Sequence, residues 1–278
     1  CSAKIERTRT DGESTMYVQT SRLRHWVEID GPHDGVPLVF SNSLGASTAM
    51  WRPQVEAFAS NYRVVRYDQR GHGKSDVIAD AYGFEALVDD ALALLDALAL
   101  ERVHFVGLSL GGMTALGLAL AHTGRLRSIT AANCVATVPP AGQALWDERA
   151  KLAREQGLGP LVAPSLERWF TAGTRAARGD ELRWVGEMIA ATPVAGYVAT
   201  CEALKTLDYL DSLPHITVPT LFVAGTHDMG APLAAMQDMH ARVVHSRFVE
   251  LDAAHVSNLE RPAEFNAALG DFLRATDR

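Results

Sequence analysis

Short apolar segments alternate with longer helical patterns along most of this chain, and this alternation constrains the fold more than any other feature. Strand-forming residues occupy positions 36–40, 62–67, 103–108, 126–132, 220–224 and 247–251. Helical periodicity occupies positions 84–98, 111–122, 232–242 and 262–274. Two alternating segments, 17–20 and 23–29, predict an antiparallel hairpin at the start. The pattern predicts an α/β fold, with a mostly parallel sheet, an antiparallel start and helices on both faces.

Residues 134–213 interrupt the alternation, because they show helical periodicity and no convincing strand. The segment also concentrates aromatic side chains, namely Trp146, Trp169, Phe170, Trp184 and Tyr197. We expect a helical cap inserted over the carboxyl ends of the strands, where ligands bind in open α/β sheets. The predicted organisation is a core of residues 16–133 and 214–278, a cap of residues 134–213, and a polar extension of residues 1–15.

The composition disfavours several classes of protein. The 278 residues carry 26 basic and 33 acidic side chains, and the formal net charge of −7 argues against binding to nucleic acid. No apolar run reaches the roughly 18 residues that cross a bilayer, so no membrane partner is expected. Cys1, Cys134 and Cys201 are too few for a disulfide framework and predict free thiols in a reducing, cytoplasmic compartment. A lipid-bearing Cys1 is the alternative, and a homo-oligomer is left open.

The segment Gly107-Leu108-Ser109-Leu110-Gly111 fits the G-x-S-x-G pattern at the junction of a predicted strand and a predicted helix. On such a turn a serine hydroxyl projects above the sheet, where it can act as a nucleophile. A glycine-rich turn with a solvated serine is the structural alternative, which the strand–turn–helix context disfavours. Ser109 is therefore the candidate nucleophile.

A serine hydroxyl needs a base, and the base needs an acid that fixes its tautomer. His255 follows the last predicted strand, from which a loop can reach Ser109. Two strands can carry the acid in this fold; Asp228 follows one of them, whereas Asn133, which is not an acid, follows the other. Asp252 is a weaker alternative because it lies so close to His255 along the chain. The order Ser109, Asp228, His255 is that of α/β hydrolases.

The oxyanion of the tetrahedral intermediate needs two backbone N–H donors. Leu110, the residue after the nucleophile, is predicted to supply one. The loop after the strand at 36–40 is predicted to supply the other through Leu44, and Gly45 lets that loop turn tightly. An ordinary turn is the alternative interpretation of this loop.

No cofactor or metal is expected. Gly73-Lys74-Ser75 resembles the end of a phosphate-binding loop, but Asp68 stands where that pattern demands glycine. H-E-x-x-H does not occur, and no cluster of histidines and carboxylates has the spacing of metal ligands. The segment from Asp68 to Ser75 is better interpreted as a structural loop.

Several segments resemble the 3-oxoadipate enol-lactonase family of α/β hydrolases, over about residues 23–274. The likeness is carried by Val39-Phe40-Ser41-Asn42-Ser43-Leu44-Gly45, Met50-Trp51, Arg66-Tyr67-Asp68-Gln69-Arg70-Gly71-His72-Gly73, Gly107-Leu108-Ser109, Gly225-Thr226-His227-Asp228 and Glu250-Leu251-Asp252-Ala253-Ala254-His255-Val256-Ser257-Asn258. In the cap it is carried by Trp146-Asp147-Glu148-Arg149 and Glu167-Arg168-Trp169-Phe170-Thr171. The family usually has Met where Leu110 stands and Thr where Ala231 stands.

The resemblance implies an α/β-hydrolase fold with a cap, and an enzyme that opens an enol-lactone with an acetate arm to give 3-oxoadipate in aromatic catabolism. Asn42 and Ser43 are implied substrate contacts, since many relatives carry His-Gly there. The substrate's carboxylate needs a local cation in an acidic protein. Arg149, one helical turn from Trp146, is the candidate, with Trp146 beside it in the cleft. An ordinary surface arginine is the alternative.

Other functions stay open at this point. A general carboxylesterase, a perhydrolase or a carbon–carbon bond hydrolase of a ring-cleavage pathway would use the same triad, because function resides in the pocket rather than the fold. A catalytically silent ligand receptor on a hydrolase scaffold is a third class, against which the complete triad argues. In the leading interpretation the partner is a small-molecule lactone or ester.

Overall fold

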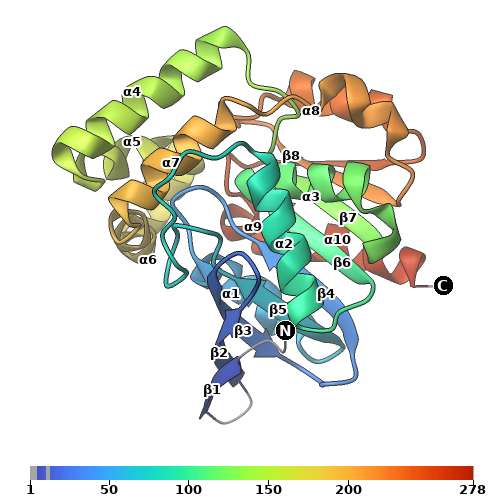
Figure 1. Ribbon diagram of the computed structural model, residues 1–278. Coiled ribbons are helices and arrows are strands. Elements are labelled where there is room, and N and C mark those ends of the chain that lie inside the picture. The colour runs from blue at the N-terminus through green and yellow to red at the C-terminus, as the bar shows by residue number, and fades with distance from the viewer. Residues whose placement is uncertain (1–4, 11–12, 278) are drawn as a thin grey trace.

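The strand-forming segments come together in a single sheet. The computed structural model describes residues 5–10 and 13–277, which form nine strands in the order β1-β2-β3-β5-β4-β6-β7-β8-β9 (Figure 1). The strands are β1 (Ile5–Thr10), β2 (Glu13–Gln19), β3 (Arg24–Asp30), β4 (Val36–Ser41), β5 (Tyr62–Tyr67), β6 (Val103–Leu108), β7 (Leu126–Ala132), β8 (Thr220–Gly225) and β9 (Arg247–Leu251). Strands β1 to β3 pair antiparallel, β3 pairs antiparallel with β5, and all later pairings are parallel.

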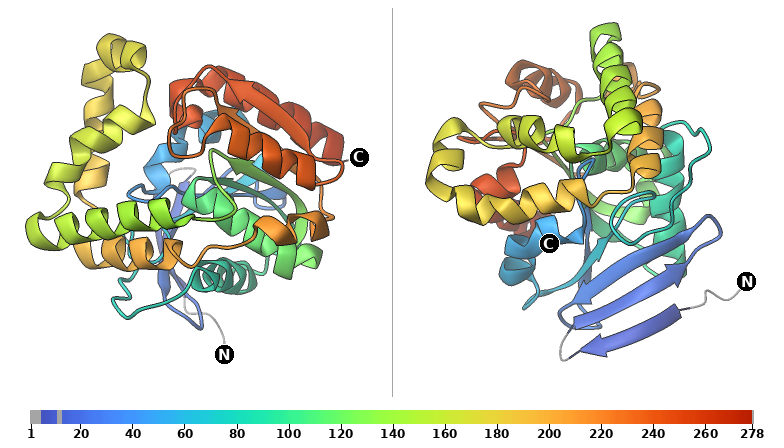
Figure 2. Two further views of the ribbon diagram at one scale, coloured as in Figure 1. Left: turned by 90° about the horizontal axis from the view of Figure 1, so that it is seen from above. Right: turned by 90° about the vertical axis from the view of Figure 1, so that its left-hand side faces the viewer.

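Helices cover both faces of this sheet (Figure 2). The core helices are α1 (Arg52–Phe58), α2 (Glu85–Ala97), α3 (Leu110–Ala121), α8 (Leu233–Arg242), α9 (Ser257–Glu260) and α10 (Pro262–Thr276), with 3-10 helices at Thr48–Trp51, Thr123–Arg125 and Leu210–His215. Buried side chains of α2, α3 and α8 pack on one face, and those of α1 and α10 pack on the other. Every residue of β6 and β8 is buried, as expected of central parallel strands covered on both sides.

The predicted α/β-hydrolase fold is confirmed. The sheet nevertheless begins earlier than the predicted boundary at residue 16, because β1 and the first residues of β2 pair within the segment interpreted as an extension. Polar and charged residues dominate that segment, and such residues are typical of an edge strand, which has no apolar face to reveal it. Cys1 lies outside the described residues.

The residues between β7 and β8 form four helices: α4 (Pro140–Gln156), α5 (Gly159–Trp169), α6 (Ala172–Ala190) and α7 (Val194–Leu204). Helix α4 packs against α7, and α5 packs against α6. These helices stand to one side of the sheet when the molecule is viewed from above (left panel of Figure 2). They meet the sheet where the loop that follows β6 carries Ser109, so they form the cap wall of the site described below.

Two further features concern membrane-spanning helices and the free thiols. Among the described residues, no helix combines the length and the apolar character that crossing a bilayer requires. Cys134 and Cys201 are both buried and free, and burial raises the pKa of each thiol above its usual value. Neither thiol is therefore activated as a nucleophile.

Candidate active site

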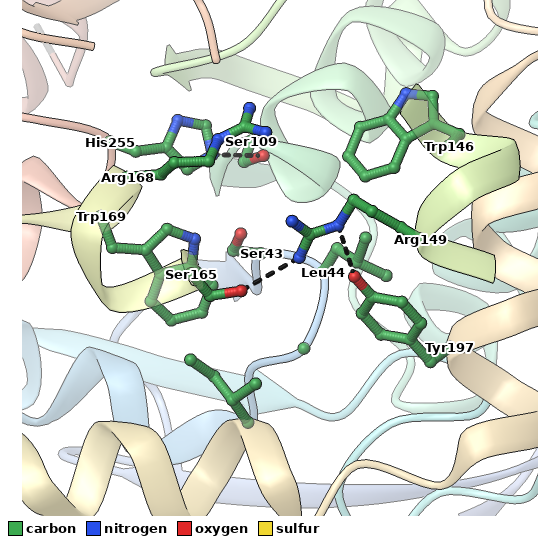
Figure 3. A pocket seen from close by; sticks show the side chains of 12 residues that line it. Ser43, Leu44, Ser109, Trp146, Arg149, Ser165, Arg168, Trp169, Tyr197 and His255 are labelled. Atoms are coloured by element: carbon green, nitrogen blue, oxygen red, sulfur yellow. Dashed lines mark hydrogen bonds between the residues drawn. The ribbon is translucent and has the colours of Figure 1, made fainter. Parts of the chain in front are cut away.

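The backbone at Ser109 is strained. This residue connects the end of β6 to the first residue of α3, with φ 56° and ψ −113°. A non-glycine residue with such angles costs on the order of 1–3 kcal/mol and needs support from its surroundings. The sharp turn directs the Ser109 hydroxyl into a cavity between core and cap (Figure 3).

The two glycines of the pattern are required by close packing. A Cβ on Gly107 would lie 1.9 Å from the carbonyl oxygen of Gly111, and one on Gly111 would lie 2.0 Å from the carbonyl oxygen of Ser41. No side chain fits at either separation. The turn can therefore bring α3 against β4 and β6 only with glycine at both positions.

The structure brings the three predicted catalytic side chains together. His255 Nε2 lies 2.9 Å from Ser109 Oγ (Figure 3). On the other side of the ring, His255 Nδ1 lies 2.8 Å and 3.0 Å from the two carboxylate oxygens of Asp228. The segments that carry them follow β6, β8 and β9, whose carboxyl ends lie at the same edge of the sheet. This geometry allows a proton to pass from the serine to the imidazole, while the carboxylate holds the ring.

Both carboxylate oxygens of Asp228 accept hydrogen bonds. Its Oδ1 accepts hydrogen bonds from the amides of Gly230 at 2.7 Å and Ala231 at 3.0 Å, and its Oδ2 accepts one from Asn133 Nδ2 at 3.0 Å. Burial alone would raise the Asp228 pKa. The His255 ring and these donors outweigh burial and hold the pKa of Asp228 below its usual value, so it stays a carboxylate.

Asn133 positions the acid, whereas the sequence alone indicates only that Asn133 is not an acid itself. Its backbone has a positive φ of 47°, which asparagine tolerates better than most residues. Besides Asp228, its amide nitrogen binds the carbonyl oxygen of Ala254 at 3.2 Å, and its side-chain oxygen accepts from Ser257 Oγ at 2.6 Å. Asn133 therefore ties the acid to the loop that carries His255.

Asp252, the alternative acid, points elsewhere. Its carboxylate is exposed, binds His227 Nε2 at 2.8 Å and lies 3.5 Å from Arg261 Nη2. The ring of His255 is bound by Asp228 instead. Proximity along the chain does not place Asp252 in the site, because the loop turns its side chain toward the surface.

Two backbone amides near the nucleophile have no acceptor among the described residues. Neither the Leu44 N–H nor the Leu110 N–H has a hydrogen-bond acceptor within the part of the chain that the structure describes. Leu110 is the first residue of α3, where a helix leaves its N–H groups unpaired. Leu44 and Ser109 line the same cavity. The two amides are therefore available for an oxyanion on a carbonyl attacked by Ser109.

Asn42, predicted to contact the substrate, lies behind the Leu44 loop instead, and its side chain is fully buried. Its Nδ2 donates to the Tyr67 carbonyl at 3.0 Å, and its Oδ1 accepts from Trp51 Nε1 at 2.9 Å. Its own carbonyl accepts from Gln69 Nε2 at 2.6 Å. The prediction of a direct contact is corrected: the amide is already occupied, and Asn42 holds the loop in place. By contrast, Ser43 lines the cavity, and its hydroxyl points toward Ser109 (Figure 3).

We call this cavity the arginine chamber. All four cap helices contribute residues to its cap wall. Its cap residues are Trp146 and Arg149 on α4, Ser165, Arg168 and Trp169 on α5, Ile189 on α6 and Tyr197 on α7. The chamber measures about 40 Å³. One water needs roughly 10–15 Å³ by the same measure, so the chamber has room for a few atoms, such as those of a carboxylate group.

Arg149 lies where the sequence predicted, on the same face of α4 as Trp146 (Figure 3). Its Nε donates to Tyr197 Oη at 2.8 Å and its Nη2 donates to Ser165 Oγ at 3.0 Å. Both partners are neutral hydroxyls; burial raises the pKa of Tyr197 to about 12. The Arg149 charge is thus oriented by hydroxyl groups and forms no ion pair with an acid in residues 5–10 and 13–277.

Arg168 is a second cation that sequence reasoning did not assign. It has no hydrogen bond or ion pair with another of the described residues, and its guanidinium lies in front of Ser109 and His255 in the chamber (Figure 3). Burial, and next the charge of Arg149, lower the pKa of Arg168, and the charge of Asp228 offsets this only in part. Two half-buried guanidinium groups that repel each other would both gain from a bound carboxylate. The signal for Arg168 was the segment Glu167 to Thr171, which carried the resemblance without a stated role.

The cap is bonded directly to the histidine loop. Glu260 accepts hydrogen bonds from the backbone and hydroxyl of Thr171, at 2.9 and 2.6 Å, and from the amide of Ala254 at 2.7 Å. The Val256 amide also donates to the Trp169 carbonyl at 3.2 Å. The segment that carries Arg168 and Trp169 is therefore held in register with His255.

Comparison with known proteins agrees with this geometry. A family model of the alpha/beta hydrolase fold matches residues 36–262. The chain is 39% identical to 3-oxoadipate enol-lactonase 1 of Acinetobacter baylyi, over 90% of this chain and 92% of that protein, and 38% identical to enol-lactonase 2 of the same organism, over 86% and 89%. The crystal structure of the enol-lactonase from Burkholderia xenovorans LB400 superposes with a TM-score of 0.90 at 37% identity, covering 93% of this chain and 99% of that one. The chain is therefore an ester hydrolase that belongs to the 3-oxoadipate enol-lactonase family of α/β hydrolases.

Proposed function

We propose that this enzyme opens 3-oxoadipate enol-lactone to 3-oxoadipate, in the breakdown of aromatic compounds, through an acyl-enzyme on Ser109. The observation that carries the proposal is the pair of guanidinium groups, Arg149 and Arg168, which form no ion pair with an acid among the described residues and line the same cavity as Ser109 and His255. A neutral ester has no use for two such cations. An ester with a short carboxylate arm does.

Acylation begins at the hydrogen bond between His255 and Ser109. Nε2 of His255 accepts the serine proton while Oγ attacks the lactone carbonyl carbon. Asp228 stabilises the imidazolium that forms. The Leu44 and Leu110 amides donate to the developing oxyanion, a contribution that typically amounts to about 3–4 kcal/mol for one donor of this kind.

Collapse of the tetrahedral intermediate breaks the ring C–O bond and expels an enolate, which takes the proton from His255. The enolate is a better leaving group than a simple alkoxide, so the site needs only moderate assistance at this step. Water then attacks the acyl carbon with His255 as base, Ser109 leaves with the proton, and 3-oxoadipate is released.

The arginine chamber orients the substrate. Its small volume accepts the carboxylate group, which leaves the ring at the mouth of the chamber beside Ser109. Trp146 lines the chamber on the side from which Arg149 enters it and offers its ring as a flat wall (Figure 3). Because the protein carries a net charge of −7, these two local cations determine whether an anionic substrate can approach the serine.

The proposal is tested by following the loss of ultraviolet absorbance of freshly generated enol-lactone in the presence of the enzyme. A companion assay compares Arg149→Ala with the wild type on the enol-lactone and on phenyl acetate. We expect a loss of about 10–100-fold in kcat/KM on the enol-lactone alone. An equal loss on both substrates would contradict the carboxylate role, and absence of enol-lactone turnover in the wild type would refute the proposed function.

A further inference from the structure

A second cavity opens on the other side of the Ser109–His255 pair. It measures about 440 Å³, against about 40 Å³ for the arginine chamber. The two cavities share Ser109, Trp146, Arg168 and His255 in their walls, so a ligand in either one reaches the same nucleophile. We call this second cavity the apolar chamber.

The walls of the apolar chamber are mostly aliphatic. They come from α3, from the segment after β7, from α4, from the Leu210 turn and from α8. The apolar wall includes Met113, Val135, Leu145, Leu210, Ala235 and Met239. The charged side chains in the lining are Arg168, at the boundary with the arginine chamber, and the exposed Asp238. Cavities of several hundred cubic ångströms with such walls are typical sites for apolar parts of ligands.

The proposed enol-lactone does not account for this chamber. Its carboxylate arm belongs with the two arginines, and its five-membered ring carries no alkyl group that would enter an aliphatic cavity. At the rim, the apolar side chain of Met229 lines the chamber and is 68% exposed, so the opening of the chamber is apolar like its walls.

We propose that the same triad also hydrolyses uncharged esters that carry an unbranched alkyl chain, with the chain lying in the apolar chamber. Ser109 Oγ attacks the ester carbonyl, the C–O bond to the alcohol breaks, and the alcohol leaves with the proton from His255. Water then hydrolyses the acyl-enzyme and releases the carboxylic acid. Water is the only co-reactant, so this second activity needs nothing beyond the proposed triad.

The test measures kcat/KM for two series of esters with a pH indicator. Methyl butyrate, hexanoate and octanoate lengthen the acyl chain, and butyl, hexyl and octyl acetate lengthen the alcohol. In at least one series we expect kcat/KM to rise roughly threefold per added methylene, the gain that burial of one such group provides. A flat profile in both series would overturn the inference.

A variant with a larger side chain in the apolar chamber tests where the alkyl chain of the ester lies. Ala235 lines the chamber on α8, whereas its neighbour Ala234 is exposed on the same helix and does not line it. In Ala235→Trp we expect the rate advantage of the C8 ester over the C4 ester to fall at least about tenfold, because the indole takes the space of the chain. In Ala234→Trp the advantage should persist. An unchanged advantage in a folded Ala235→Trp protein would show that the chain lies elsewhere and would refute the assignment.

Two controls separate this inference from the proposed function. Ser109→Ala should abolish hydrolysis of both ester series, and ester hydrolysis that survived it would overturn the second activity at this serine. Enol-lactone turnover is measured on the same preparations. Its absence would refute the proposed function alone, whereas a flat chain-length profile with good enol-lactone turnover would refute only the inference about the apolar chamber.

Discussion

The core and the cap form opposite walls of one site, and they differ in whether their charged side chains are already paired with a group of opposite charge. On the core wall, Asp228 binds His255 and accepts further hydrogen bonds from Asn133 and two backbone amides. On the cap wall, neither Arg149 nor Arg168 forms an ion pair with a carboxylate among the described residues. The charged side chains of the core wall are therefore paired without a ligand, whereas its Leu44 and Leu110 amides remain available for an oxyanion. The cap wall leaves charge for a ligand to neutralise, and under the proposed function it selects the ester.

The largest effect is expected on the core wall. Ser109→Ala removes the nucleophile, and kcat should fall by at least about 10⁴-fold for the enol-lactone and for methyl butyrate alike. Both rates are measured at saturating substrate, with circular dichroism to verify the fold. Retention of a few per cent of either activity would mean that another group performs the attack.

A substitution on the cap wall should separate the two substrates. Arg168→Met keeps the length of the side chain and removes its charge, so kcat/KM on the enol-lactone should fall about 10–100-fold, with little change on methyl butyrate. Arg183, an exposed arginine on α6, provides a control with the same change in net charge. A similar loss in Arg183→Met would point to long-range attraction rather than to contact.

Asn133→Ala should weaken the core wall without removing a reacting group. Loss of one donor to Asp228 should lower kcat about tenfold on both substrates. The same loss raises the pKa of Asp228, since that donor helps to lower it, and catalysis requires the carboxylate form. The acid limb of the kcat/KM profile should therefore shift to higher pH. An unshifted limb would show that Asn133 has only a structural role.

Glu260 joins the two walls, and its substitution should affect stability more than chemistry. Burial opposes ionisation of Glu260, but hydrogen bonds from Thr171, Thr174 and Ala254 outweigh it, and the Glu260 pKa lies below its usual value of 4.5. The stabilisation is therefore present above about pH 4.5 and is lost as the pH falls through the lower native pKa.

Glu260→Gln should lower the free energy of unfolding by about 2 kcal/mol at neutral pH. Urea unfolding at several pH values measures it. The difference between wild type and variant should shrink as the pH falls below about 4, because the wild type then loses the same charge. A difference that stayed constant as the pH fell well below about 4 would indicate lost packing instead.

The sequence predicts a site residue when the evidence for it lies in neighbouring residues of the chain, and it fails when the evidence depends on residues distant in sequence. Ser109, Asp228 and His255 each follow a strand that hydrophobic pattern reveals, and the carboxyl ends of parallel strands meet at one edge of the sheet. The roles of Asn42 and Arg168 depend on neighbours distant in sequence. The side-chain amide of Asn42 is hydrogen-bonded to Tyr67 and Trp51. Whether Arg168 forms an ion pair with an acid depends on how the cap helices pack. Helical periodicity predicts that such helices exist, but it does not determine their arrangement over the sheet.

The central claim is that the arginine chamber makes this an enzyme for a carboxylate-bearing lactone. The most direct test compares kcat/KM for the enol-lactone with that for the same molecule bearing a carboxamide in place of the carboxylate, both followed by ring opening. We expect the carboxylate to be preferred by about 100-fold in the wild type and by less than about threefold in Arg149→Met/Arg168→Met. Equal rates on the two compounds in the wild type would contradict the account.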